Sequence, residues 1–293
     1  MANEHFPPRQ KSLAYNTVVG FINLAVLLFL LVSGSMLQHN LLATAMIVLG
    51  LLLILPLLLI AYRIFTILTT VYTLNRDYLE ITWGLRREVI PMGEIDWIHP
   101  ITDFETPLPL GFTLLRGSYY SEKEISGLGK TLFVATLPEK MVLVKHQQRF
   151  LVISPENVEG FMENYELFAQ MGSLQHVQAE SENLKMLWQR VWSDPWARRL
   201  LSAGAISLLL LFVASLIISL AKQQIVWVSM EYVPAARAML MAMIGLFFGL
   251  INTFTGLLLY LQDRVAAFLR NLLWGTTVLV NLILIFALIF MAI

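Results

Sequence analysis

The strongest constraint on the fold is a set of five apolar runs, each about 20 residues long. A helix rises about 1.5 Å per residue, so each run is long enough to cross the roughly 30 Å hydrocarbon core of a bilayer. We predict spans at about residues 18–37, 41–62, 200–220, 239–261 and 272–292. Only 14% of the residues are charged and 57% are hydrophobic, which is not the composition of a soluble protein. We therefore expect a multi-pass membrane protein with five transmembrane helices.

The first run also has an alternative interpretation as a secretory signal peptide, because residues 32–35 (Val-Ser-Gly-Ser) resemble a cleavage site. The run is long for a signal peptide and a second apolar run follows at once, so we favour an uncleaved span. We expect residues 1–15 to form a frayed polar tail. Pro56 should kink the second span.

The basic residues near the predicted helix ends gather on one side of the membrane. The larger group is Arg9, Lys11, Arg63, Lys185, Arg190, Arg198, Arg199, Arg264 and Arg270, whereas the other side has only Lys222 and Arg237. Lys and Arg are enriched in cytoplasmic loops. We therefore expect a cytoplasmic N-terminus and an external C-terminus.

Between the second and third runs, residues 67–169 change to a two-residue periodicity. Leu79, Ile81 and Trp83 alternate with more polar residues, which is typical of a half-buried strand. We predict strands at residues 71–75, 78–83, 86–90, 94–98, 131–136, 141–145 and 149–153. A tight turn at residues 75–77 should join the first two strands. This segment should lie in the cytoplasm.

A helix should follow the last strand. We predict Ser154 as its N-cap and Pro155 as its first residue. Its apolar residues fall on one face. They are Val158, Phe161, Met162, Tyr165 and Phe168. Successive strands closed by one helix are the order of a pleckstrin-homology-like (PH-like) barrel with a C-terminal capping helix.

Four stretches carry a resemblance to the bacterial PH-domain family of membrane proteins. They are YTLNRDYLEITWGL (72–85), VIPMGEIDWI (89–98), GLG (127–129) and VISP (152–155). The resemblance covers about residues 70–168 and implies a bacterial plasma-membrane protein with a cytosolic PH-like domain beside its transmembrane helices. Lipid-binding PH domains hold phosphoinositides with several basic residues around the first hairpin loop, where this chain has only Arg76 beside Asp77. Residues 66–168 hold nine Lys and Arg against fourteen Asp and Glu, so we do not expect phosphoinositide binding.

The connection at residues 100–130 is long for a compact domain, and such loops are often functional. Its candidate contact residues are Leu108, Leu110, Phe112, Leu114, Leu115, Tyr119 and Tyr120. Three interpretations fit this apolar density. The loop lies on the bilayer surface or docks on the helices, it binds a partner protein, or it forms a locally buried extra core. We favour the first only slightly.

A polar helical linker is predicted over residues 170–193. Trp188, Trp192 and Trp196 recur at i, i+4 and i+8, which would place them on one helical face. We interpret them as interfacial anchors, because Trp prefers the headgroup level, with a binding stripe as the alternative. Asp194 should cap the third span, with Pro195 at the first helical position.

The fourth span carries a face of small and polar residues. Its members are Gly245, Gly249, Asn252 and Gly256, and Asn281 and Asn23 in other spans are possible partners of Asn252. We favour packing within the chain's own helices over a partner-binding face. The spans contain no Asp, Glu, Lys, Arg or His, which argues against proton-coupled transport but leaves a path for a neutral solute open.

No catalytic pattern is visible. The chain has no cysteine, which excludes thiol catalysis and Cys-ligated metal. Its five histidines are scattered without zinc-site spacing, and P-loop, G-x-G-x-x-G and G-x-S-x-G motifs are absent. We expect no enzyme activity, no cofactor, no metal and no nucleic-acid partner.

Four parts follow from these predictions: a tail and hairpin (1–66), a PH-like domain (67–169), a linker with an interfacial helix (170–195) and three further spans (196–293). We expect a non-catalytic interaction protein, acting as a scaffold or accessory subunit of a membrane complex. Its partners would be the bilayer and an unidentified membrane or cytosolic protein, docked in part by strand addition to a sheet edge. The alternative is a lipid- or small-molecule-handling protein whose helices hold a neutral ligand.

Overall fold

The chain divides into two compact units in a computed structural model. The described residues are 3–103, 119–125, 128–147, 149–182, 184–227, 230–261 and 267–292. The first, here the β unit, comprises Met1–Phe21 and Leu58–Leu184. The second, here the bundle unit, comprises Ile22–Leu57 and Lys185–Ile293.

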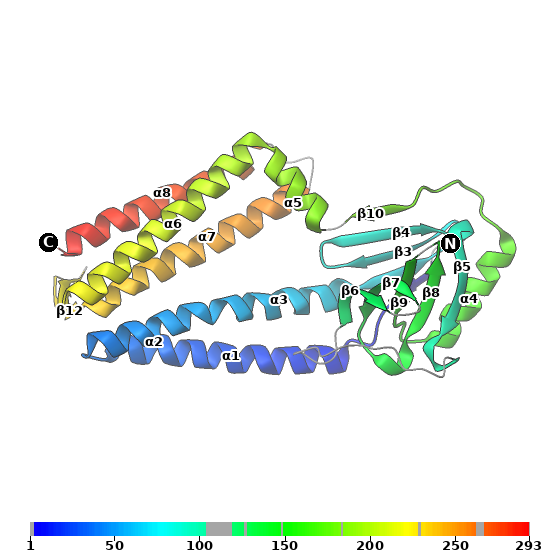
Figure 1. Ribbon diagram of the computed structural model, residues 1–293, viewed down its shortest axis with the longest axis horizontal. Coiled ribbons are helices and arrows are strands. Elements are labelled where there is room, and N and C mark those ends of the chain that lie inside the picture. The colour runs from blue at the N-terminus through cyan, green and yellow to red at the C-terminus, as the bar shows by residue number, and fades with distance from the viewer. Residues whose placement is uncertain are drawn as a thin grey trace. The chain divides into compact units, whose positions relative to one another are not determined.

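Two five-stranded sheets form the β unit (Figure 1). In the first sheet the order is β1-β2-β3-β4-β10, with neighbouring strands antiparallel. These strands are β1 (Asn3–His5), β2 (Val71–Leu74), β3 (Tyr78–Trp83), β4 (Arg86–Pro91) and β10 (Glu180–Glu182). Asn75 closes the predicted turn between β2 and β3, because its Oδ1 accepts hydrogen bonds from the N–H groups of Asp77 and Tyr78, each at 2.8 Å.

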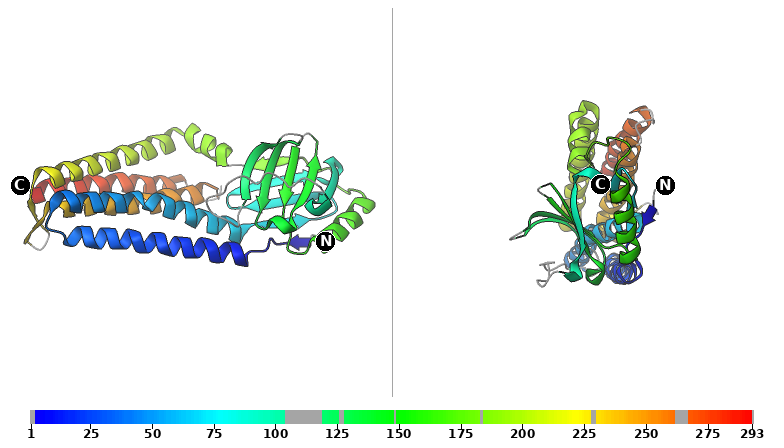
Figure 2. Two further views of the ribbon diagram at one scale, coloured as in Figure 1. Left: turned by 60° about the horizontal axis from the view of Figure 1, so that its bottom comes forward. Right: turned by 90° about the vertical axis from the view of Figure 1, so that its right-hand side faces the viewer.

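The second sheet has the order β5-β8-β9-β7-β6, and its strands lie side by side in Figure 2. They are β5 (Ile95–Pro100), β6 (Tyr119–Ile125), β7 (Gly129–Ala135), β8 (Val142–His146) and β9 (Arg149–Ile153). β7 and β9 are parallel, and the other pairs are antiparallel. The seven predicted strands are confirmed. β6 was missed, because it lies within the predicted long connection. Short 3₁₀ turns are η1 (Met92–Glu94), η2 (Ile101–Asp103) and η3 (Pro138–Lys140).

The main core of the β unit fills the space between the two sheets and α4 (Val158–Met171). Its buried residues include Tyr72, Leu79 and Ile81 from the first sheet, Val134, Val144 and Leu151 from the second, and Phe161 and Phe168 from α4. Alternate residues of the second sheet, Phe133, Leu143 and Val152, form another buried cluster. β7, β8 and β9 are therefore buried on both faces, which explains their nearly continuous apolar sequences.

Helix α4 presents its predicted apolar face to the core but begins later than predicted. Asn157 is its N-cap, and its Oδ1 accepts a hydrogen bond from the N–H of Gly160 at 3.0 Å. The prediction of a Ser154 cap is wrong, because Ser154 is buried beside β7. Its Oγ accepts instead from the N–H of Thr136 at 2.8 Å.

The prediction of a frayed N-terminal tail is also wrong for residues 3–9. β1 pairs with β2, and the carbonyl of Phe6 accepts from the N–H of Glu156 at 2.8 Å. His5 meets the ring of Phe161 edge-on at 5.1 Å, and Arg9 Nη2 donates to the carbonyl of Thr70 at 2.7 Å. Contacts to both α4 and the first sheet therefore hold the tail.

The linker after α4 is not one helix, contrary to the prediction. α4 ends at Met171, and the following Gly172 adopts φ +68°, a backbone conformation that favours glycine. The carboxylate of Asp77 then accepts hydrogen bonds from Ser173 Oγ and from the N–H groups of Leu174 and Gln175. The Gln175 and Leu174 N–H groups lower the pKa of Asp77. Strand β10 follows, and only then does α5 (Leu184–Ser193) begin.

Within the described residues, five helical segments are long and apolar enough to cross a membrane, as the sequence predicts. They are α1 (Gln10–Met36), α2 (Asn40–Leu52) with α3 (Ile54–Thr69), α6 (Pro195–Ala221), α7 (Ala238–Leu261) and α8 (Ala267–Ala292). The break between α2 and α3 at Leu53 accompanies Pro56, which has no N–H to offer the preceding turn. α1 and α3 contribute residues to both units.

In the bundle unit, α6, α7 and α8 pack side by side (Figures 1 and 2). A small hairpin of β11 (Gln224–Val226) and β12 (Tyr232–Pro234), followed by η4 (Ala235–Arg237), joins α6 to α7. Its buried residues Ile225 and Val233 pack with Leu211 and Leu288. The hairpin is too short to give a periodic signal and was not predicted.

Candidate functional site

A charged cleft of about 160 Å³ lies in the β unit where the inner faces of the two sheets end. On β4 the residues Arg86, Glu88 and Ile90 share one face, since alternate residues of a strand point the same way. Ile90 belongs to the core, whereas Arg86 and Glu88 line the cleft. Likewise, Leu151 on β9 is in the core and Arg149 is in the cleft. The inward positions thus change from apolar to charged along each strand.

Both signs of charge line this cleft. The cations are Arg86, Lys130 and Arg149, and the carboxylates are Glu88, Glu122 and Glu182. Burial raises the pKa of Glu88, and a hydrogen bond from Ser181 Oγ at 3.0 Å partly offsets that rise. Burial lowers the pKa of His146, and the positive charge of Arg149 lowers it further. A cleft with this balance suits a zwitterionic or mixed-charge segment better than a polyanion.

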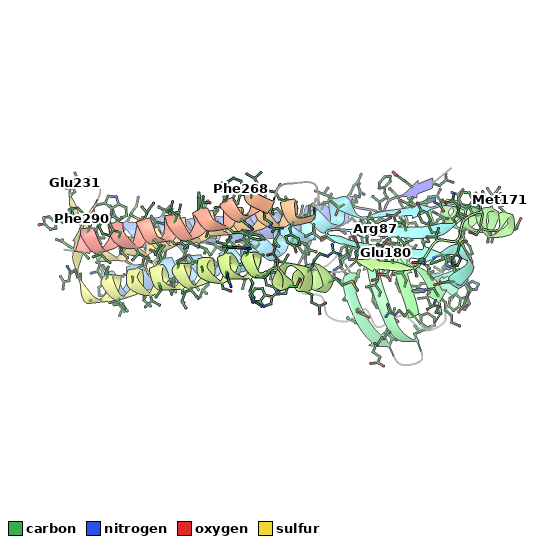
Figure 3. All side chains as sticks on the ribbon, turned by 90° about the horizontal axis from the view of Figure 1, so that it is seen from above. Arg87, Met171, Glu180, Glu231, Phe268 and Phe290 are labelled. Atoms are coloured by element: carbon green, nitrogen blue, oxygen red, sulfur yellow. The ribbon has the colours of Figure 1, made fainter. Side chains whose placement is uncertain are left out.

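Strand β10 occupies the β4 edge beside the cleft. It pairs through three residues, Glu180 with Val89, Ser181 with Glu88 and Glu182 with Arg87. Arg87 lies 3.5 Å from Glu180, and both side chains are largely exposed (Figure 3). Such an exposed pair contributes only about 0–1 kcal/mol. The backbone pairing of three β10 residues with β4 is therefore the main interaction that keeps β10 in place.

The predicted contact residues of the long connection are mostly not placed. Leu108, Leu110, Phe112, Leu114 and Leu115 lie outside the described residues. Tyr119 and Tyr120 begin β6 and point to opposite faces of the sheet, the first to the second cluster and the second to the main core. The hydroxyls of Tyr120 and Thr70 are 2.9 Å apart, and burial raises the pKa of Tyr120 to about 12. Tyr120 is thus a packing residue of the β unit.

The three predicted anchor tryptophans do not share one continuous helical face. Trp188 and Trp192 stack on α5 with ring centroids 5.5 Å apart, and both are about half exposed. Trp196 lies on α6, because Asp194 ends the preceding turn and caps α6 as predicted. The Asp194 carboxylate accepts from the N–H groups of Trp196 and Ala197 and pairs with Arg270 at 2.7 Å.

The glycine face of α7 lies against α8 and α6. A Cβ at Gly245 would come within 2.6 Å of Asn281 Oδ1 and of Leu211, and one at Gly256 would overlap Trp274. Asn252 Nδ2 donates to the hydroxyls of Thr276 and Thr277, at 3.1 and 3.2 Å. The predicted pairing of Asn252 with Asn281 or Asn23 is wrong, because Asn281 Nδ2 donates to Ser207 on α6 at 3.0 Å.

An apolar groove of about 600 Å³ runs between α6 and α7 in the bundle unit, with residues of α8 as its floor. Its lining includes Trp188 and Trp192 of α5, Gly204 and Ala205 of α6, Gly249 of α7, and Trp274 and Thr277 of α8. A second apolar groove of about 380 Å³ shares Ala205, Leu208 and Leu246 with it. The sequence did not reveal these grooves, because a gap between helices depends on their packing.

A protein-family model described as "Bacterial PH domain" matches residues 70–167. The predicted resemblance is therefore confirmed for this third of the chain. β1, β10 and all of α6, α7 and α8 lie outside the match. No curated protein and no solved structure gives a significant match to the chain.

Proposed function

We propose that this chain, which carries a bacterial PH domain at residues 70–167, is a non-catalytic membrane protein that docks a protein partner at the bacterial plasma membrane. Its apolar helices would insert in the bilayer and its two sheets would act as a cytosolic PH-like barrel. The count of basic residues near the helix ends supports this orientation. The role is that of a scaffold or an accessory subunit of a membrane complex.

The edge of β4 carries the proposal. A segment from outside the PH domain already adds a strand there, so this edge accepts an extended peptide backbone. β10 spans only three residues, and its sequence Glu-Ser-Glu places acidic side chains beside Arg87. In strand addition the backbone bonds give affinity, and pockets beside the edge give specificity. An extended, mixed-charge segment of a partner would replace β10, and an acidic residue of that segment would reach Arg149 or Lys130 in the cleft.

Photo-crosslinking in native membranes tests this proposal. A photoreactive residue replaces Arg87 in the full chain, with Glu166 on the exposed side of α4 as the control position. A second background carries Ser181→Pro, because proline weakens a strand by removing an N–H. We expect a discrete protein adduct at position 87 that increases with Ser181→Pro and is absent at position 166. No adduct at position 87 in either background, or equal adducts at both positions, would contradict the proposal.

A second candidate function is the handling of an apolar ligand by the helices. The groove of about 600 Å³ supports it, since ligand sites measure about 300–1,000 Å³ and are mostly apolar. Purification from native membranes followed by lipid and small-molecule mass spectrometry tests this function. A stoichiometric apolar compound would support it, and a protein free of any such compound would count against it.

A further inference from the structure

The groove between α6 and α7 exists because its walls have little side-chain volume. Gly204 and Ala205 on α6 and Gly249 on α7 line its walls, and Thr277 of α8, which is only 7% exposed, lies at the floor. The methyl group of Thr277 lies 3.7 Å from where a Cβ would stand on Gly204, and 3.3 Å from the equivalent point on Gly249. The groove therefore depends on small residues from two helices that converge on the same residue of a third.

One end of this groove has the character of a membrane interface. The stacked indoles of Trp188 and Trp192 line it there, and both are about half exposed. Tryptophan concentrates at the headgroup level, where its ring is in apolar surroundings and its N–H reaches water. The rest of the lining is aliphatic or small, with Ser202, Thr253 and Thr277 as its hydroxyl groups. The groove thus leads from the headgroup level into the apolar zone.

Exposed arginines surround the same end. Arg190 lies in the last turn of α5, and Arg198 and Arg199 lie in the first two turns of α6. Arg198 and Arg199 directly precede Leu200 and Leu201, which line the groove. None of the ion pairs among the described residues includes these three arginines, and the nearby Asp194 pairs with Arg270. The interfacial end is therefore positively charged.

We infer that this groove binds one acyl chain of an anionic phospholipid, whose phosphate is held by Arg198 and Arg199. Basic pockets between transmembrane helices at the cytoplasmic face bind anionic headgroups. The charge selects an anionic lipid over a zwitterionic one, and the apolar lining of the groove suits an acyl chain. This inference rests on the second candidate function and deepens it, because it names the ligand class and the headgroup contacts.

Native mass spectrometry of the full chain tests the inference, with phosphatidylglycerol and phosphatidylcholine supplied together in detergent. Ala205→Phe fills the groove, and Leu210→Phe is the matched control, because Leu210 is exposed on the same helix but lines neither groove. Arg198→Gln and Arg199→Gln remove the proposed headgroup contacts. We expect wild type and Leu210→Phe to retain phosphatidylglycerol preferentially, and Ala205→Phe to retain little of either lipid. Each arginine substitution should reduce the preference for phosphatidylglycerol about fivefold.

The two kinds of variant separate the possible failures. Unchanged lipid retention in Ala205→Phe would overturn the inference together with its premise that the groove holds a ligand. If Ala205→Phe lowers retention but the arginine variants keep the preference for phosphatidylglycerol, the headgroup assignment is overturned while the second candidate function survives. A dimer that replaces bound lipid would also overturn the inference, because a second copy of the chain would then fill the groove.

Discussion

Substitution of Tyr72 by phenylalanine should loosen the connection between the two sheets of the β unit. Tyr72 is fully buried on β2. Its hydroxyl donates to the carbonyl of Val134 on β7 at 2.7 Å and accepts from the N–H of Ser154 at 3.3 Å. Ser154 in turn accepts from Thr136, whose hydroxyl donates to the carbonyl of Pro8 at 2.9 Å. One phenol therefore joins both sheets through a chain of bonds that reaches the N-terminal tail.

The size of the effect follows from this geometry. Phenylalanine keeps the ring in the core, so the loss is confined to the hydroxyl. Leaving buried hydrogen-bonding groups without a partner costs about 1–3 kcal/mol. This cost corresponds to a factor of about 5–150 in an equilibrium constant. Backbone amides of β7 and β9 whose hydrogen exchange requires the whole unit to open should therefore exchange faster by that factor. Hydrogen exchange on the full chain in nanodiscs measures this directly.

Tyr165→Phe is the matched control for Tyr72→Phe. Tyr165 packs on the same core from α4 but is only partly buried, so the same chemical change should alter stability by less than about 0.5 kcal/mol. If Tyr72→Phe leaves exchange of β7 and β9 unchanged, or if both variants accelerate it equally, the proposed link between the sheets is refuted.

Two further predictions concern the cleft and the helix packing. The raised pKa of Glu88 means that the folded state holds this proton more tightly than the unfolded state, so wild-type stability falls as pH rises from the ordinary Glu value through the raised one. Glu88→Gln should therefore be more stable than wild type at pH 7 and lose this advantage in acid. Thermal unfolding of both proteins at several pH values measures this, and a difference in unfolding temperature that stays constant with pH would contradict it. Gly245→Ala should destabilise the bundle unit by about 1–3 kcal/mol through overpacking against Asn281 and Leu211, whereas Gly275→Ala, whose Cβ would meet only Leu200 at 4.0 Å, should have little effect. Equal unfolding temperatures in detergent for the two glycine variants would refute the close packing of α7 on α8.

Periodic patterns made most of the fold predictable from the sequence. The alternation around Leu79, Ile81 and Trp83 and the apolar runs each extend over enough residues to identify strands or helices. β1 and β10 have three residues each and carry no periodic signal. Their positions follow from the edges of β2 and β4 that they cover, and those edges exist only in the folded sheet.

Two local errors arose from competing signals. Ser154 followed by Pro155 has the pattern of a helix start, but the buried Ser154 hydroxyl is used by Thr136, and Asn157 caps α4 instead. The i, i+4, i+8 spacing of the tryptophans assumed one helix across Asp194, although the predicted cap at Asp194 already required a new helix there. In both places a tertiary or capping hydrogen bond outweighed simple spacing.

The charged cleft was partly visible in the sequence. Arg86 and Glu88 share the parity of Ile90 on β4, and Arg149 shares that of Leu151 on β9. A strand whose inward positions change from apolar to charged therefore marks an open end of the β-structure. The groove between α6 and α7 gives no such signal, because Gly204, Gly249 and Thr277 come together only when three helices pack.

Single-cysteine labelling in intact cells tests most directly the claim that the PH domain lies in the cytoplasm while the helices cross the membrane. The chain has no native cysteine, so each introduced thiol is unique. Glu166→Cys reports on the exposed side of α4, and Tyr232→Cys reports on the hairpin between α6 and α7. A membrane-impermeant maleimide should label Cys at position 232 in intact cells and Cys at position 166 only after permeabilisation. Labelling of position 166 in intact cells, with position 232 protected, would contradict the orientation and with it the proposed docking of a cytosolic partner.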